Sequence, residues 1–190
     1  MKTFTYEFQS PFTKEELDNF IKKFDQALPK LGTLGKKPAN EQTYRIANGT
    51  WIKDLTDDIS ERFKKIVSGI TGLPVENQEL PHFVRYEVGG KYDIHSDYFV
   101  PNTDHYENCI KRGGQRVFST ILYLNDDFDG GETEFPFFNL KIRPFQGKIF
   151  SWRNMTLDGQ LYKESRHAGL PVVSGIKYIL IIWTREKKFV

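Results

Sequence analysis

The hydrophobic pattern of this chain changes its period once, near residue 80. Before that point, apolar residues recur at helical spacing in residues 13–29 and in about 56–70. After it, short segments alternate with a period of two between Gly, Asn, Asp or Pro residues. The strand-like segments are residues 82–88, 91–99, 116–125, 131–135, 140–144, 147–152 and 177–185. Two helices followed by many short strands predict an α+β, mainly β fold, with helices on one face of an antiparallel sandwich or barrel.

Local signals set the expected ends of the two helices. Thr13 is a favourable N-cap, and Glu16 three residues later completes a capping box. Pro29 ends the first helix, and Gly72 is a stop signal for the second. Between the helices, residues 30–42 are rich in Gly, Lys and Pro, which predicts a loop.

The length of the chain favours one domain. Its 190 residues can bury a sizeable core and are a poor fit to two domains. We therefore expect a single domain over residues 1–190. Helical support, with a short strand at residues 3–9, would occupy about 1–79, and the β core would occupy about 80–190.

Charge and cysteine content limit the kinds of binding partner and the cellular compartment that we expect. The net charge of +2 is too small to argue for nucleic acid or for an anionic membrane surface. No apolar run approaches the ~18 residues of a membrane span, and residues 1–12 lack the apolar core of a signal peptide. Cys109 is the one cysteine, so no disulfide can form within the chain. We expect a cytoplasmic protein without a nucleic-acid or membrane partner.

A histidine and an aspartate with metal-ligand spacing lie in the second strand-like segment. Residues two apart on a strand point to the same face, so His95 and Asp97 can aim an imidazole and a carboxylate into one cavity. A closed sandwich can bring His167 back to this pair from the far side of several strands. Two His and one carboxylate form the facial triad of non-haem Fe(II) oxygenases, although zinc accepts the same ligand types.

A lysine opens the last and most apolar strand. Lys177 has the same parity as Ile179, Ile181 and Trp183, so it should lie on a buried face. A buried ammonium group needs an anionic partner. A dicarboxylate co-substrate would provide one, with one end on the metal and the other on Lys177.

Five stretches, spread over nearly the whole chain, carry a family resemblance. They include "RYEVGGKYDIHSDYF" (85–99) and "GGQRVFSTILYLNDDFDGGETEFP" (113–136). The other three are residues 44–52, 147–154 and 165–184. In this order they resemble the catalytic domain of the prolyl 4-hydroxylases, which are Fe(II)- and 2-oxoglutarate-dependent dioxygenases. The resemblance implies a double-stranded β-helix, or jelly roll, with N-terminal supporting helices.

The resemblance also implies roles for nine residues. The implied iron ligands are His95, Asp97 and His167. The residues implied to bind 2-oxoglutarate are Lys177, Tyr123 and Tyr86. The residues implied to lie beside the peptide substrate are Arg116, Tyr92 and Trp183. Because Tyr92 precedes His95 by three positions, its role requires a bulge or a turn, which the glycines at 89–90 favour.

The implied reaction is hydroxylation at carbon 4 of a prolyl residue in a peptide or protein. Its requirements are Fe(II), the co-substrates 2-oxoglutarate and O₂, and ascorbate as reductant, and it releases succinate and CO₂. One alternative is the same chemistry on free proline, another amino acid or a small metabolite. A second alternative is a non-catalytic jelly-roll binding module, although binding alone does not need open positions on a metal.

Several polar features have ordinary interpretations. Cys109 is more simply an incidental loop thiol than a nucleophile, because no flanking motif supports catalysis. His82 and His105 are expected to be structural or surface residues. Residues 126–132 lack the spacing of an EF-hand and predict a hairpin turn. The long segment 100–115 has the length of a lid or a binding loop.

Overall fold

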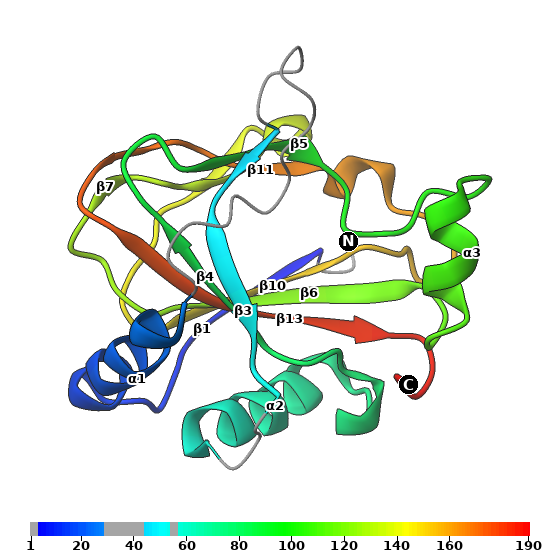
Figure 1. Ribbon diagram of the computed structural model, residues 1–190. Coiled ribbons are helices and arrows are strands. Elements are labelled where there is room, and N and C mark those ends of the chain that lie inside the picture. The colour runs from blue at the N-terminus through cyan, green and yellow to red at the C-terminus, as the bar shows by residue number, and fades with distance from the viewer. Residues whose placement is uncertain (1–3, 29–43, 54–56) are drawn as a thin grey trace.

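The computed structural model describes residues 4–28, 44–53 and 57–190 (Figure 1). The start of the strand expected at residue 3, the loop expected at 30–42 and the start of the second helix near 56 lie outside these residues. The helices are α1 (Lys14–Ala27), α2 (Asp58–Thr71) and α3 (Asp104–Ile110), with short 3₁₀ turns η1 (Val75–Asn77), η2 (Pro136–Phe138) and η3 (Lys163–Ser165). Across the described ranges, each helix is too short or too polar to span a bilayer.

Two antiparallel sheets form the body of the molecule. The larger sheet has the strand order β1 (Thr5–Gln9), β10 (Lys148–Arg153), β6 (Arg116–Tyr123), β13 (Lys177–Arg185), β4 (His82–Tyr86) and β3 (Asn48–Trp51). The smaller sheet has the order β2 (Arg45–Ile46), β5 (Lys91–His95), β11 (His167–Gly169), β8 (Thr133–Phe135) and β9 (Leu140–Ile142). A further pair joins β12 (Val172–Ser174) to β7 (Asp129–Gly130). This arrangement confirms the mainly β, α+β prediction.

The helices form where the local signals predict them. The Thr13 side chain accepts a hydrogen bond from the backbone N–H of Glu16, and Glu16 returns the bond to the Thr13 backbone, so the capping box is confirmed. Gly72 ends α2 in the left-handed conformation with a φ of 70°, as a C-terminal glycine should. Both helices cover the outer face of the larger sheet, on the opposite side from β5 and β11 (Figure 1).

The larger sheet is buried on both faces, which explains why every residue of β13 is buried. Its outer face packs on α1 and α2 through residues such as Leu180 and Ile182. Its inner face packs toward the smaller sheet through Ile179, Ile181 and Trp183. Alternate residues of one strand therefore belong to two separate apolar clusters, and Lys177 has the parity of the inner one.

Two register shifts bring side chains of unlike parity to one face. Residues Tyr92 to His95 of β5 lie opposite only Gly169 to His167 of β11, which is a β-bulge in β5. The expected irregularity is therefore present, but inside β5 and not at the glycines 89–90. A second shift, between β6 and β13, sets Phe118 opposite Thr184 but Arg116 opposite Arg185. Arg116 therefore takes the inner face, which residue 117 would have if the alternation were unbroken.

Some elements carry no clear signal in the sequence. The strand expected at residues 3–9 is present as β1, but β2 and β3 were not expected, and β11 and β12 each have only three residues. The segment 100–115, expected to be a loop, contains α3. The hairpin turn expected at 126–132 is wrong, because the flanking strands β6 and β8 belong to different sheets and this segment crosses between them. Periodicity cannot show which sheet a following strand joins.

Candidate active site

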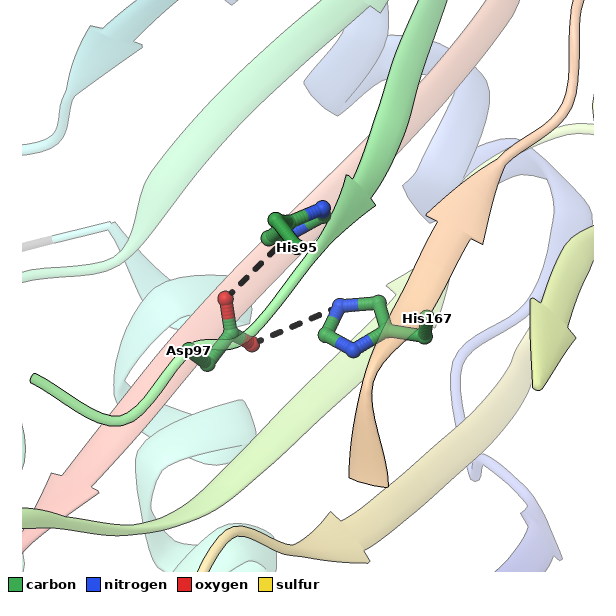
Figure 2. A group of neighbouring side chains, drawn as sticks. All are labelled: His95, Asp97 and His167. Atoms are coloured by element: carbon green, nitrogen blue, oxygen red, sulfur yellow. Dashed lines mark ion pairs between the residues drawn. The ribbon is translucent and has the colours of Figure 1, made fainter. Parts of the chain in front are cut away.

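Three ligand-type side chains meet between the two sheets (Figure 2). His95 ends β5, Asp97 lies in the turn that follows, and His167 begins β11, directly opposite His95 in register. Nε2 of His95 lies 3.5 Å from Oδ1 of Asp97, and Nε2 of His167 lies 3.7 Å from Oδ2. All the potential ligand atoms lie within 4.8 Å of one another, and all three residues are buried. The structure therefore brings the predicted triad together.

Backbone carbonyl groups orient both imidazole rings. Nδ1 of His95 lies 2.8 Å from the carbonyl oxygen of Asp93, and Nδ1 of His167 lies 3.0 Å from that of Ser165. Because a carbonyl only accepts, each Nδ1 carries a hydrogen, and each Nε2 faces the Asp97 carboxylate. Burial lowers the pKa of His167 to about 4, so its ring is neutral at physiological pH. Two imidazoles and a carboxylate fit Fe(II) as a donor set.

A buried polar chain holds the Asp97 carboxylate. Ser119 on β6 donates a hydrogen bond of 2.5 Å to Oδ2 of Asp97. Asn154, which follows β10, donates a bond of 2.8 Å to the Ser119 hydroxyl. Burial alone would raise the pKa of Asp97, but the neighbouring His167 and His95 outweigh burial and lower it below its usual range. The carboxylate is therefore ionised and oriented, as a metal ligand must be.

Lys177 lies in the same cavity as the triad. Its Nζ donates a hydrogen bond of 2.6 Å to the carbonyl oxygen of Gly131, and it lies 5.2 Å and 5.7 Å from the ring centroids of Tyr86 and Tyr123. Burial lowers the pKa of Lys177 to about 8, while Glu132 acts in the opposite direction. In the described part of the chain, no carboxylate forms an ion pair with Lys177. The expected anionic partner is therefore not a described residue of the protein.

The two tyrosines flank Lys177 differently. Tyr86 lies opposite Lys177 in register and lines the cavity. Tyr123 is fully buried, and its hydroxyl shares a hydrogen bond of 2.7 Å with the hydroxyl of Thr133. Thr133, which the sequence analysis missed, stands on the cavity wall in front of Tyr123. Burial raises the pKa of both phenols, so both remain neutral hydrogen-bond donors at physiological pH.

The bulge in β5 turns Tyr92 toward the metal centre. Its ring stacks on His95 with centroids 3.5 Å apart and an interplanar angle of 15°. Arg45, its cross-strand neighbour on β2, also packs on this ring, with its guanidinium 4.8 Å from the Tyr92 centroid. Tyr92 therefore lies at the mouth of the cavity, packed directly against a proposed ligand, and Arg45 is a cleft residue that the sequence analysis missed.

Arg116 lies on the other side of the mouth. Its guanidinium stacks 4.0 Å above the Trp183 ring and makes two hydrogen bonds of 2.7 Å to the buried Glu79. Arg185 donates to the same carboxylate at 2.8 Å. Burial would raise the pKa of Glu79, but the two arginines outweigh it and lower the pKa. The fork of Arg116 is thus held on an aromatic surface facing the cleft, and Glu79 is its unforeseen support.

The remaining candidates lie outside the metal centre. His82 starts β4, is buried, and stacks on Trp51 with centroids 4.4 Å apart. Burial lowers the pKa of His82 to about 3, so the ring is uncharged. Cys109 is on α3, where its backbone carbonyl accepts a hydrogen bond from Arg185. Residue 105 is on the same helix.

The sequence matches a known protein family and several of its members. Residues 81–185 match the family described as the 2OG-Fe(II) oxygenase superfamily. Prolyl 4-hydroxylase 5 of Arabidopsis thaliana is 31% identical over 198 aligned residues, which cover 93% of this chain and 66% of that protein. A putative prolyl 4-hydroxylase of Acanthamoeba polyphaga mimivirus is 31% identical, covering 95% of this chain and 72% of that protein.

Solved structures agree with these relatives. The viral collagen prolyl hydroxylase of Paramecium Bursaria Chlorella virus-1, determined as a 2OG complex, superposes with a TM-score of 0.73. It is 25% identical, and the match covers 97% of this chain and 96% of that one. A prolyl-4-hydroxylase of Pseudomonas putida has the same fold, with a TM-score of 0.65 and 19% identity. These likenesses confirm the double-stranded β-helix expected from the sequence.

Proposed function

Because this chain belongs to the 2OG-Fe(II) oxygenase superfamily and, within it, to the prolyl 4-hydroxylase family, we propose that it hydroxylates prolyl residues of a peptide or protein at carbon 4. The family and the triad imply Fe(II) and 2-oxoglutarate, and the prolyl hydroxylase relatives imply a peptide substrate. Ascorbate as reductant and a cytoplasmic location are further parts of this proposal. The chain spans 66% of the length of the Arabidopsis relative. The activity of the whole protein is therefore part of this proposal.

The observation that carries the proposal is one cavity with two different binding ends. The triad forms one end, and Lys177, buried and without a carboxylate partner among the described residues, forms the other. A buried ammonium group without an anion is costly, which supports a ligand that brings its own carboxylate. 2-Oxoglutarate has one carboxylate for Lys177 and a keto acid for the metal.

The residues around Lys177 would bind and orient the far carboxylate. Lys177 supplies a charged donor, and Tyr86 and Thr133 line the same cavity. Tyr123 fixes the Thr133 hydroxyl from behind. A carboxylate met by several preorganised donors is held in one orientation, which places the keto acid toward the triad.

The chemistry that Fe(II) supplies when bound is the oxidation of 2-oxoglutarate by O₂ to succinate and CO₂, coupled to insertion of one oxygen atom into a substrate C–H bond. The residues that would hold the ion are His95, Asp97 and His167. Apolar side chains make up much of the remaining wall and keep bulk water from the reaction. Those side chains are Val84, Ile121, Ile179, Ile181 and Trp183.

The mouth of the cavity would position the target residue. Tyr92, Trp183 and Arg116 line the cleft, and the peptide would contact their exposed edges. Arg116 would donate to peptide carbonyls through the guanidinium hydrogens that Glu79 does not take. Glu79 keeps Arg116 in place from inside the protein.

The test is a hydroxylation assay with Fe(II), 2-oxoglutarate and ascorbate. A proline-rich peptide should stimulate succinate release, gain the mass of one oxygen atom, and yield 4-hydroxyproline on hydrolysis. Stimulation by free proline or another amino acid, and not by the peptide, would favour the small-molecule enzyme. No turnover of any kind, with metal still bound, would favour the binding module. The inactive control is His167→Ala.

A further inference from the structure

Asp97 is the one member of the triad that lies outside a strand. β5 ends at His95, so Asp97 lies two residues beyond the strand, in a bend of the chain (Figure 2). His95 is held by its cross-strand pairing with His167, but this pairing does not extend to Asp97. A carboxylate that serves as a metal ligand needs a fixed position. The position of Asp97 therefore depends on contacts from other parts of the chain.

The side chain of Gln115 holds the backbone on the far side of this bend. Its Oε1 accepts a hydrogen bond of 2.7 Å from the backbone N–H of Phe99, and its Nε2 donates a bond of 2.9 Å to the Phe99 carbonyl. One carboxamide thus pairs with both backbone groups of one residue, as a neighbouring strand would. Gln115 is 5% exposed, so both bonds are shielded from water. Asp97 lies midway between two fixed points, His95 and Phe99.

Gln115 and Phe99 are themselves anchored at the end of the larger sheet. The backbone N–H of Gln115 donates a bond of 2.6 Å to the carboxylate of Glu186, which follows β13, and the Gln115 carbonyl accepts one of 3.0 Å from the Glu186 backbone. The guanidinium groups of Arg116 and Arg185 lie 4.9 Å and 4.6 Å from the centroid of the Phe99 ring. The bend is therefore tied to the two central strands β6 and β13.

The β6 region contacts the bend at two places with different effects. Ser119 within β6 donates to the Asp97 carboxylate and so orients the side chain. Gln115, directly before β6, bonds the main chain that carries this side chain. A side-chain bond can orient a carboxylate only if the backbone beneath it stays in place, so the two contacts act together.

We propose that Gln115 is a positioning residue for the metal centre. By fixing the backbone of Phe99, it holds the Asp97 carboxylate where both imidazoles of the triad can bind the same ion. Gln115 acts through the main chain and has no bond to the triad itself among the contacts of the described residues. The inference rests on the proposed function, because it takes the triad to be a metal site.

Binding of Co(II) to the metal-free protein tests this role. Gln115→Met keeps the length of the side chain and removes both bonds to Phe99. Residues that orient metal ligands change metal affinity by about 10- to 100-fold when they are replaced, so the Kd for Co(II), measured by calorimetry without co-substrate, should rise by this factor. The Fe(II) concentration for half-maximal turnover should rise similarly, while kcat at saturating Fe(II) should change less.

A second variant guards against misfolding of the first. Gln115→Asn keeps a carboxamide, but its shorter side chain cannot reach both backbone groups of Phe99. It should also weaken Co(II) binding, and it decides the test if Gln115→Met does not fold. In the metal-free protein, the Phe99 amide should exchange its hydrogen faster in either variant, because this N–H loses its acceptor.

Gln78→Met is the matched control. Gln78 is 3% exposed, and its Nε2 donates a bond of 2.9 Å to the backbone carbonyl of Lys64 in α2, on the outer side of the larger sheet. This variant also removes a buried carboxamide that bonds the backbone, so it should lower the thermal midpoint. It should leave the Kd for Co(II) and the exchange of the Phe99 amide unchanged.

The outcomes separate this inference from the function on which it rests. Unchanged Co(II) binding in the Gln115 variants, or an equal loss in Gln78→Met, would overturn the inference and leave the proposed function intact. A raised peptide KM with unchanged Co(II) binding would also overturn it, because Gln115 would then only order the segment 100–114. If the protein hydroxylates no substrate but binds Co(II) in a way that Gln115→Met weakens, the proposed function fails and the positioning role stands.

Discussion

Removing the buried charge of Lys177 should weaken co-substrate binding without destabilising the fold. Lys177 is 4% exposed, and its hydrogen bond to the Gly131 carbonyl is the one polar contact described for its Nζ. A charge-assisted hydrogen bond to a carboxylate contributes on the order of 1.5–3 kcal/mol. Lys177→Ala should therefore raise the KM for 2-oxoglutarate roughly 10- to 150-fold, at a factor of ten per ~1.4 kcal/mol.

A second substitution tests whether the lysine serves binding or the fold. Lys177→Met keeps much of the packing volume and removes the ammonium group, whose burial destabilises the protein without an anion. We expect the thermal midpoint of this variant to stay the same or rise while 2-oxoglutarate binding weakens as it does in the alanine variant. Lys177→Arg should recover part of the affinity, because it keeps the charge but has a larger head group.

The pH dependence of the same KM gives an independent check on Lys177. Burial places the pKa of Lys177 at about 8 in the free protein, so the ammonium form that binds a carboxylate is lost as pH rises above that value. The apparent affinity for 2-oxoglutarate should fall above about pH 8, and this fall should be absent in Lys177→Met. Binding of the anion should in turn raise the lysine pKa, because the charged form gains a partner.

Succinate release at increasing 2-oxoglutarate concentration is the decisive assay. The control variant is Lys148→Ala, which removes a largely buried lysine of β10 that pairs with Glu7 at the far edge of the larger sheet. An unchanged KM in Lys177→Ala, or an equal rise in Lys148→Ala, would place Lys177 outside the co-substrate site and refute the reasoning.

Three further outcomes are expected of the site. His167→Ala should retain less than about a tenth of wild-type turnover with its fold intact by circular dichroism, and higher activity would contradict the ligand assignment. Arg116→Ala should raise the KM for a peptide while sparing 2-oxoglutarate turnover without substrate, and an equal rise in both KM values would remove its substrate role. Ser119→Ala should weaken Co(II) binding, measured by calorimetry without co-substrate, by about 10- to 100-fold. Thr120→Val is its control, because it removes a buried hydroxyl on the same strand that bonds Ser151 on the other face of the sheet, and equal losses in both variants would show a general packing effect.

Short-range spacing was enough to place several site residues. Lys177 shares parity with Trp183 on β13, so strand geometry alone put this pair on one face. His95 and Asp97 do meet as their spacing predicts, although β5 ends at His95 and Asp97 lies in the turn that follows. Capping chemistry was equally reliable, because the bonds between Thr13 and Glu16 join residues three apart. Both kinds of prediction depend only on local backbone geometry.

The rest of the site depends on contacts between distant segments. The bond from Ser119 to Asp97 and the pairing of Glu79 with Arg116 join residues on separate strands and turns, and no spacing rule foretells them. Ser119 does share the parity of Tyr123 on β6, which is the signal that could have marked it as inward-facing. The two bulges move Tyr92 and Arg116 to the inner face against simple alternation. Bulges follow from how neighbouring strands pair, which one strand's sequence does not specify.

The cross-strand pairing of His95 with His167 has a consequence for the mechanics of the fold. These residues face each other in register although they are far apart in sequence, so an ion bound to both acts as a removable cross-link between β5 and β11. Such a link favours the native state by mass action, by about 4 kcal/mol at a thousand times the Kd. Amide hydrogen exchange in β5 and β11 should slow on metal addition, more than in β1 or β9 at the sheet edges. Metal supply would then control both the catalytic activity of the protein and how long it survives proteolysis.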